Sequence, residues 1–492
     1  MLTASNKTKI AITTNTVTDK NNVIMPVFDF NSKTYFKYRK CDAGDSSFIN
    51  RYAEGYNMVD YSSSDINMSV PGVDFPGENS WLSQSDMRTH LTTVFIYPGH
   101  YYSTHPKWFA TKNGNTGTYS NGPSYVDWQL CFTAHGDTSE YNAMVNETAT
   151  KIKNEYDRQF PTNRPTKILE LTVADNDNRC NCSACKAMEA QYGSLAATLI
   201  KFVNDVNSKV HSSSAYDNLE IGTSAYLQYE KPPVGITSDV AVRIAPIRAN
   251  YFHSIDDREY NEDAYQMFEG WSKVARLHSW LYETNFENYL LPFNSFESIT
   301  KSIKYMSQKN VEYAYIEGQH NVADQRRTGF TDLKVYLDGK FMHNPDSDYN
   351  ELLDRYFLNY FGEGHEKMRT FFDELVNRMN QFDTSYTPIS AGINTKRIWN
   401  KDELEKWVSL CKEAIDLVSN PIIKENILAE SIFPQFALCS LFGSSYSSNV
   451  IYAMRQSFKN DADSLGINMT KDSSSIANTI REKYYKPWGL VS

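Results

Sequence analysis

An amide between two acidic residues follows one strand-like run of the chain. Asp175, Asn176 and Asp177 come directly after the largely apolar residues 168–174. A carboxylic acid can donate a proton to a departing oxygen, and a neighbouring amide or carboxylate can orient a substrate group. An isolated aspartate at such a place is equally typical of a helix N-cap. The segment is therefore a candidate catalytic site only if other strand ends carry groups that complete it.

Four later strand-like runs also end in polar or aromatic residues. These residues are Tyr226; Arg243 and Arg248; Trp280, Tyr282, Glu283 and Asn285; and Glu317, Gln319 and His320. Hydrolysis of a glycosidic bond needs an acid that protonates the leaving oxygen and a second group that stabilises the oxocarbenium-like centre. Amphipathic aromatic rings suit the faces of sugars. The residue types therefore predict a site that cleaves carbohydrate.

The elements that would position these residues alternate between strands and helices up to about residue 330. We predict strands over residues 34–39, 57–61, 92–97, 128–133, 168–174, 219–226, 240–247, 278–282 and 313–317. Helices are predicted over residues 140–159, 194–210, 263–276 and 296–308. Such alternation indicates parallel β/α units, and roughly eight of them close a barrel with its site at the carboxyl ends of the strands.

After residue 345 the strand signal ends and only helices are predicted, over residues 349–361, 364–379, 401–418 and 423–442. We therefore expect an α/β protein with a (β/α)8 TIM-like barrel and a helical C-terminal domain. The expected boundaries are an extension over residues 1–30, the catalytic barrel over residues 31–340 and the helical domain over residues 341–492.

Composition narrows the class of partner. The formal net charge is −10, whereas binding of nucleic acid needs a basic surface. No run approaches the roughly 18 apolar residues of a membrane-spanning helix, and the first residues, MLTASNKTKI, lack the apolar centre of a signal peptide. Hydrophobic residues make up 41% of the chain and aromatic residues 14%, which is enough for a sizeable core. We expect a glycan or glycoprotein substrate, no nucleic acid, no membrane span and no cofactor.

Six short segments carry a resemblance to a known family. They are HPKWFA (105–110), WQLCFT (128–133), DNDNRCNCSAC (175–185), SAYLQYEKPP (224–233), WLYETNFENYLLPF (280–293) and YIEGQ (315–319). With these segments the chain resembles, over about residues 38–379, the bacterial domain of unknown function numbered 4838, part of which is classified as glycoside hydrolase family 163. The resemblance implies endo-β-N-acetylglucosaminidase activity on N-glycans and a secreted or cell-surface protein. It also implies that His105 and Trp108 contact sugar.

The resemblance suggests a role for each residue of the strand ends. Hydrolases of 2-acetamido sugars often use the substrate's own acetamido oxygen as nucleophile, an exception to the scheme of two carboxylates. We then expect Asp177 to be the acid and Asn176 or Asp175 to orient the acetamido group. Tyr282 would donate a hydrogen bond to the developing oxazoline oxygen. Glu317 would bind sugar hydroxyls, with a catalytic role left open.

The chain also departs from the family pattern, and two other functions stay open. Asp175 stands where the family usually has glutamine, Gln191 and Tyr192 replace an acidic pair, and Leu281 replaces an aspartate. One alternative is inverting α-glucuronidase chemistry, in which Arg243 or Arg248 would hold the uronate carboxylate. The other is a glycan-binding protein without catalysis, suggested by the missing acids at Gln191 and Tyr192.

Cys180, Cys182 and Cys185 have the spacing C-x-C-x-x-C, which is typical of metal ligands. A structural zinc ion requires four ligands, and only Cys131, on a neighbouring predicted strand, is a candidate for the fourth. A local disulfide, or three thiols packed in a tight loop, fits the same spacing. We expect no metal at the strand ends themselves.

Overall fold

The computed structural model describes residues 2–3, 9–10, 35–36, 38–42, 91–112, 115–116, 128–319, 326–382, 389–473 and 475–492. The predicted strand over residues 57–61, most of the predicted extension, and His320 lie outside the described residues. Two short antiparallel pairs are present, β1 (Leu2–Thr3) with β2 (Lys9–Ile10) and β4 (Thr111–Lys112) with β5 (Asn115–Thr116).

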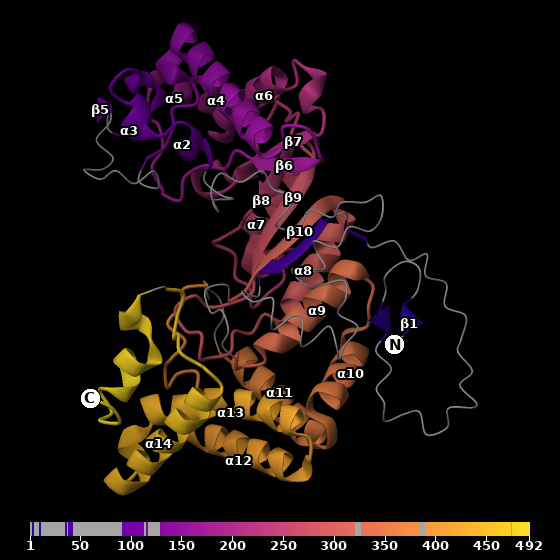
Figure 1. The fold of residues 1–492 in the computed structure, drawn as a ribbon, viewed down its shortest axis with the longest axis vertical. Coiled ribbons are helices and arrows are strands. Elements are labelled where there is room, and N and C mark those ends of the chain that lie inside the picture. Colours follow the sequence, from indigo (N-terminus) through magenta and orange to yellow (C-terminus); the bar gives the residue numbers. More distant parts are fainter. Residues whose placement is uncertain are drawn as a thin grey trace.

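Six parallel strands form one sheet at the centre of the molecule, in the order β3-β10-β9-β8-β7-β6 (Figure 1). They are β3 (Tyr38–Asp42), β6 (Lys167–Glu170), β7 (Leu219–Ala225), β8 (Ala241–Ile244), β9 (Leu277–Tyr282) and β10 (Val311–Glu317). The prediction of consecutive parallel β/α units is therefore confirmed. Within the described residues the sheet is open between β3 and β6, so the fold is a mixed α/β structure with a curled parallel sheet.

Two of the predicted strands have another conformation. Residues 91–95 form the helix α2 (Leu91–Phe95), although Thr92, Thr93 and Val94 are β-branched residues that favour strands. Residues 128–133 contribute only an isolated antiparallel bridge between Leu130 and Phe109. Most residues of both segments are buried, and packing against neighbours can outweigh the small intrinsic preference of the backbone.

The two faces of the sheet differ in chemistry because side chains alternate along a strand. One face presents Leu169, Ile221, Val242, Leu281 and Ile316 to the large hydrophobic core. Helices cover this face. They are α6 (Ala196–Val210) on β7, α7 (Arg258–Trp271) on β8, α8 (Phe296–Gln308) on β10 and α9 (Thr331–His343) on β3. The opposite face carries charged and aromatic side chains, among them Glu170, Arg243 and Trp280.

Helices lie beyond both ends of the sheet in Figure 1. At the top α4 (Thr138–Gln159) packs with α6, and α2, α3 (Pro98–Tyr101) and α5 (Ser183–Tyr192) lie nearby. At the foot are α10 (Tyr349–Phe361), α11 (His365–Asn380), α12 (Lys401–Leu417), α13 (Pro421–Leu441) and α14 (Ser448–Ser464). All four helices predicted after residue 345 are present. No described helix has the length and apolar character needed to cross a membrane.

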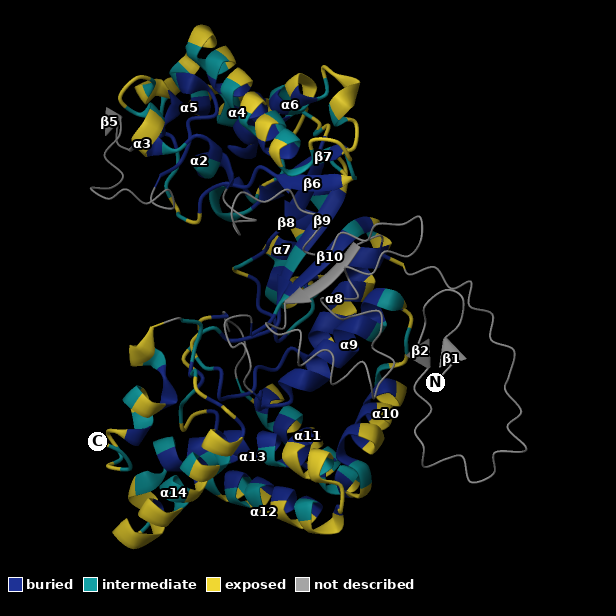
Figure 2. Ribbon diagram, viewed as in Figure 1, coloured by how far each residue is buried: buried dark blue, intermediate teal, exposed yellow. Residues whose placement is uncertain are grey.

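Burial shows how the sheet and the C-terminal helices are joined. Strands β6 to β10 and helix α9 are almost entirely buried, whereas α12 and α14 turn exposed faces to solvent (Figure 2). A helix buried on all sides normally lacks charged residues, yet α9 buries Lys334 and Asp338. The ammonium group of Lys334 donates a hydrogen bond to the backbone carbonyl of Glu283, just after β9, at 2.6 Å. These polar contacts fix α9 against the loop that leaves the sheet.

Candidate functional site

Predicted site residues from four different strand ends lie close together. The hydroxyl of Tyr226 donates a hydrogen bond to the Asp175 carboxylate at 2.7 Å, which links the segments that follow β6 and β7. On the next strands, the indole N–H of Trp280 donates to Glu317 at 2.8 Å. Tyr282 pairs with Glu317 in the parallel register of β9 and β10. Because the strands are parallel, all these groups lie at the carboxyl edge of the sheet.

Electrostatic effects show that these groups form one cluster. Burial raises the pKa of Tyr226, and the negative charges of Asp175, Glu317 and Glu230 raise that pKa further. Burial also raises the pKa of Tyr282, with Glu317 and Asp175 adding to the effect. Charges act on a group in this way only over short distances. Both tyrosines therefore stay protonated at neutral pH and can donate hydrogen bonds.

Asp177 and Glu230 share a cation. Arg248 lies 3.2 Å from an oxygen of Asp177 and 2.9 Å from an oxygen of Glu230. The Asp177 side chain is 81% exposed, whereas that of Glu230 is 21% exposed. Burial raises the pKa of Glu230, although the charge of Arg248 opposes this effect. Among the described residues, the second oxygen of Glu230 is buried and has no hydrogen-bond partner.

The sequence prediction did not include Glu230. It follows the short 3-10 helix η8 (Leu227–Tyr229) rather than the end of β7. A search limited to residues at strand ends therefore does not find it. The signal was present in the segment QYEKPP, which belongs to the quoted family resemblance. A carboxyl group directly after a short turn at a strand end can reach the same site as the strand end itself.

The Asn176 side chain holds its own loop together. Its amide nitrogen donates to the Trp128 carbonyl at 3.2 Å, and its oxygen accepts the Asn178 amide at 2.9 Å. The neighbouring Gln129 side chain exchanges two hydrogen bonds with the backbone of Ala174. Residues 128–131 therefore support the turn that presents Asp175 and Asp177.

A buried ionic network lies on the same face of the sheet. Glu170, which is fully buried, contacts the guanidinium of Arg243 at 2.9 Å and Nδ1 of His278 at 3.0 Å. The Arg243 guanidinium also lies over the rings of Trp280 and Tyr313, at 5.4 Å and 5.0 Å from their centroids. Arg243 was predicted to bind substrate. The structure gives it a supporting position, next to the Trp280 ring.

Three further predicted substrate ligands are buried in loop contacts. Glu283 is buried beside Lys334 and Asp338. The Asn285 amide donates to the carbonyl of Ala391 at 2.8 Å, and Gln319 donates to the carbonyl of Tyr289 at 3.3 Å. The Asn285 contact connects the loop after β9 to the C-terminal part of the chain, and the Gln319 contact joins the loops after β9 and β10.

His105 and Trp108 form a separate pair beside α4. Their rings stack with centroids 4.0 Å apart, and the His105 ring lies 2.9 Å from the Glu140 carboxylate. The Trp108 indole donates to the backbone carbonyl of Glu140 and is only 2% exposed. Trp108 is thus part of the core, and only the partly exposed His105 is open to a ligand.

Comparison with known proteins identifies one relationship. The family model described as "Domain of unknown function (DUF4838)" matches residues 11–373. This range includes the whole strand-end cluster and its supporting network. No curated protein matches the chain.

Proposed function

The chain belongs to the family described as a domain of unknown function (DUF4838), and from its strand-end cluster we propose that it is a glycoside hydrolase. The proposed reaction is cleavage of β-N-acetylglucosaminide linkages in N-glycans. One observation carries the proposal. Carboxylates, protonated tyrosines and a tryptophan from consecutive parallel strands lie together at the carboxyl edge of the sheet, where enzymes with parallel β/α units place their active sites.

We assign the proton donor to Glu230. A general acid must keep its proton near the working pH, and burial gives Glu230 a raised pKa. Its second carboxyl oxygen is buried and has no hydrogen-bond partner among the described residues, an environment that favours the protonated acid. Asp177, the acid expected from the sequence, is instead mostly exposed and paired with Arg248. It remains the alternative donor that the mutational test below distinguishes.

Substrate-assisted catalysis requires groups that orient the acetamido oxygen and stabilise the charge that develops on it. Asp175 is placed for the first task, since Tyr226 holds its carboxylate. Asn176 already uses both of its polar atoms in its loop. Tyr282 stays protonated because its pKa is raised, so its hydroxyl can donate to the oxazoline oxygen. The retained configuration of the product follows from this double displacement.

Trp280 and Glu317 provide the sugar-binding part of the proposed site. The half-buried Trp280 ring is a flat surface for a sugar, and its N–H fixes one oxygen of Glu317. Because a carboxylate oxygen can accept more than one hydrogen bond, Glu317 can also accept hydrogen bonds from sugar hydroxyls. The buried Glu170–Arg243 pair supports the Trp280 ring from within the sheet.

The remaining proposals concern the larger architecture. We propose that the sheet belongs to a (β/α)8 barrel over residues 31–340, followed by a helical domain over residues 341–492. The pairing of β3, from early in the chain, with the last strand β10 supports it, since first and last strands meet when a barrel closes. A secreted or cell-surface location follows from the proposed glycoprotein substrate.

A three-substrate assay tests the proposed function. We expect the protein to release glycan from a glycoprotein with complex N-glycans and to hydrolyse an aryl β-N-acetylglucosaminide, while leaving glucuronoxylan intact. Release from glucuronoxylan alone would establish the α-glucuronidase alternative instead. That alternative is disfavoured because both arginines proposed for it are already paired, Arg243 with Glu170 and Arg248 with Asp177 and Glu230.

The exposure of Asp177 favours a second candidate, a glycan-binding protein without catalysis. Saturable binding of N-glycan with no product from any of the three substrates would establish this function and exclude the hydrolase.

A further inference from the structure

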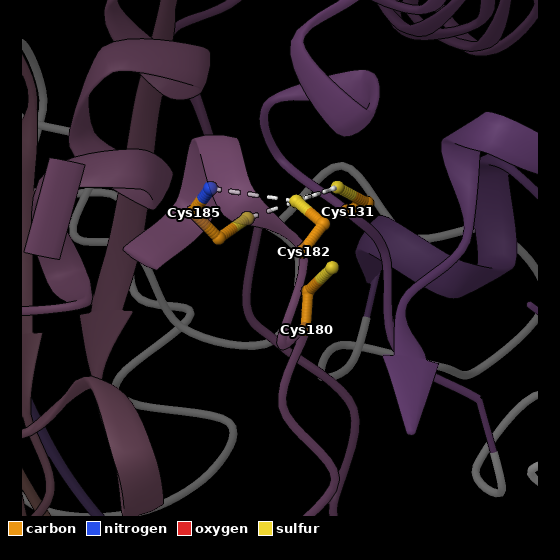
Figure 3. A group of neighbouring side chains, drawn as sticks. All are labelled: Cys131, Cys180, Cys182 and Cys185. Carbon is orange, nitrogen blue, oxygen red and sulfur yellow. Dashed lines mark hydrogen bonds between the residues drawn. The ribbon is translucent and has the colours of Figure 1, made fainter. Parts of the chain in front are cut away.

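Four cysteine side chains from two distant parts of the chain point toward one another (Figure 3). Their sulfur atoms all lie within 4.8 Å of each other. Cys131 comes from the loop after residue 128, and the other three, Cys180, Cys182 and Cys185, come from the segment that begins α5. Cys182 is half-buried and the other three are buried. Cys131, the candidate for the fourth ligand that was expected on a neighbouring strand, therefore completes the set of four.

The spacing of the sulfur atoms matches a tetrahedral metal site. The Cys131 sulfur lies 3.7 Å from the sulfurs of both Cys182 and Cys185. Four thiolates at about 2.3 Å from a zinc ion occupy the corners of a tetrahedron whose edges are about 3.8 Å long. A disulfide bond would bring two sulfurs to about 2.05 Å, and all four cysteines here are free.

The surroundings donate hydrogen bonds to the sulfurs, as the second shell of a thiolate site does. The backbone N–H of His135 donates to Cys131 at 3.2 Å, and that of Cys185 donates to Cys182 at 3.4 Å. The Thr133 hydroxyl lies 3.2 Å from the Cys185 sulfur. The first N–H groups of α5 also direct positive potential toward this cluster, which favours thiolates.

The backbone next to Cys131 has an unusual conformation that serves these contacts. Ala134 and His135 have φ angles of 42° and 56°, and Gly136 follows with 84°. Residues other than glycine rarely adopt this left-handed region, so two of them in a row raise the conformational free energy of the turn. The turn directs the His135 N–H at the Cys131 sulfur. Strain of this kind persists where stronger interactions hold the segment in place.

We propose that Cys131, Cys180, Cys182 and Cys185 bind one structural zinc ion. Four protein ligands fill the tetrahedral coordination and leave no open position for water or substrate, as in structural rather than catalytic zinc sites. The thiols release their protons to solvent as the ion binds. The ion joins residues 128–137 to residues 180–185 and so holds the loop that starts at Asp175. This role is independent of the proposed hydrolase activity.

Metal analysis of the purified full chain tests the proposal. We expect about one zinc ion per chain, and a loss to below about a tenth of an equivalent in Cys185→Ser. The matched control is Cys411→Ser, which changes another buried cysteine far along the chain and should keep its zinc. If Cys185→Ser does not fold, X-ray absorption of the unmodified protein still decides, with a shell of four sulfurs at about 2.3 Å expected.

Any one of the following results would overturn the proposal. One is an unmodified chain without zinc whose four thiols react freely with a thiol reagent under native conditions. Another is a disulfide that joins Cys131 to Cys182 or Cys185 in peptides from the native protein. The third is Cys185→Ser with undiminished zinc, or iron in place of zinc in protein grown with both metals.

Discussion

One oxygen of the Glu230 carboxylate lies 2.9 Å from the Arg248 guanidinium, while its other oxygen is buried and unpartnered among the described residues. The two oxygens therefore meet opposite conditions. The guanidinium favours the charged carboxylate, and burial favours the protonated acid. Burial has the larger effect, so the pKa of Glu230 is raised. A carboxyl group tuned in this way suits proton donation near neutral pH.

Replacing Glu230 by glutamine should remove the proton donor while keeping the size of the side chain. We expect kcat on natural N-glycan to fall by about 10²–10⁴-fold, the usual contribution of general acid catalysis. On an activated aryl glycoside, whose leaving group needs little protonation, Glu230→Gln should show a much smaller loss of kcat. Asp177→Asn is the matched comparison and should change kcat much less. If Asp177→Asn shows the large, rescuable loss and Glu230→Gln does not, Asp177 is the donor.

Replacing Arg248 by methionine should move the pH profile. Arg248 lowers the pKa of Glu230, so its removal raises that pKa further. The acid form then survives to higher pH, and the alkaline limb of the kcat profile should shift upward. The measurement is kcat from pH 4 to 10, with Arg258→Met as control, since Arg258 pairs with Glu262 on the exposed face of α7. A downward or absent shift would exclude Glu230 as the acid.

Glu317→Gln should act mainly on substrate binding. If the Glu317 carboxylate accepts hydrogen bonds from sugar hydroxyls, the substitution raises KM with a smaller change in kcat. The reason is that this interaction is made in both the ground state and the transition state. Trp280→Phe removes the N–H that orients Glu317 and should raise KM in the same direction. Steady-state kinetics on the aryl glycoside measure both constants. A fall in kcat at constant KM for Glu317→Gln would show that Glu317 takes part in the chemical step.

Glu170→Gln should destabilise the fold. The substitution keeps the shape but leaves the charge of Arg243 unbalanced in a buried position, and breaking a buried pair from one side typically costs about 3–5 kcal/mol. Urea titration gives the free energy of unfolding. The control is Glu351→Gln, which breaks an exposed pair with Arg355 on α10 and should have little effect. A loss below about 1 kcal/mol for Glu170→Gln would show that solvent reaches Arg243.

Brief treatment with EDTA should leave kcat and KM unchanged if the chemistry needs no metal. Within the described residues, neither group of side chains that could hold an ion includes Asp175, Asp177, Glu230 or Glu317. The four-cysteine site is largely buried, so EDTA should reach it only slowly during a brief treatment. Activity that EDTA abolishes and zinc restores, with the circular dichroism spectrum unchanged throughout, would mean that a metal acts in catalysis.

The positions of the site residues illustrate why only part of the site was visible in the sequence. Asp175, Tyr226, Tyr282 and Glu317 end predicted strands, and parallel strands necessarily bring such ends to one edge. Glu283 has the same residue type as Glu317 and also follows a predicted strand, but it is buried, as is Trp108. Residue type and spacing do not report which direction a loop takes after its strand. Glu230 was missed because it follows a short 3-10 helix rather than a strand end.

The sequence by itself determined the alternation of strands and helices, the helical C-terminal part and the family, because periodicity and short motifs are local properties. It also supplied three cysteines with the spacing of metal ligands. The tertiary structure alone decided that Cys131 lies beside them, that Arg248 joins Asp177 to Glu230, and that residues 91–95 are helical. Each of these depends on contacts between segments far apart in the chain, and such contacts outweigh the weak local preferences that a sequence pattern records.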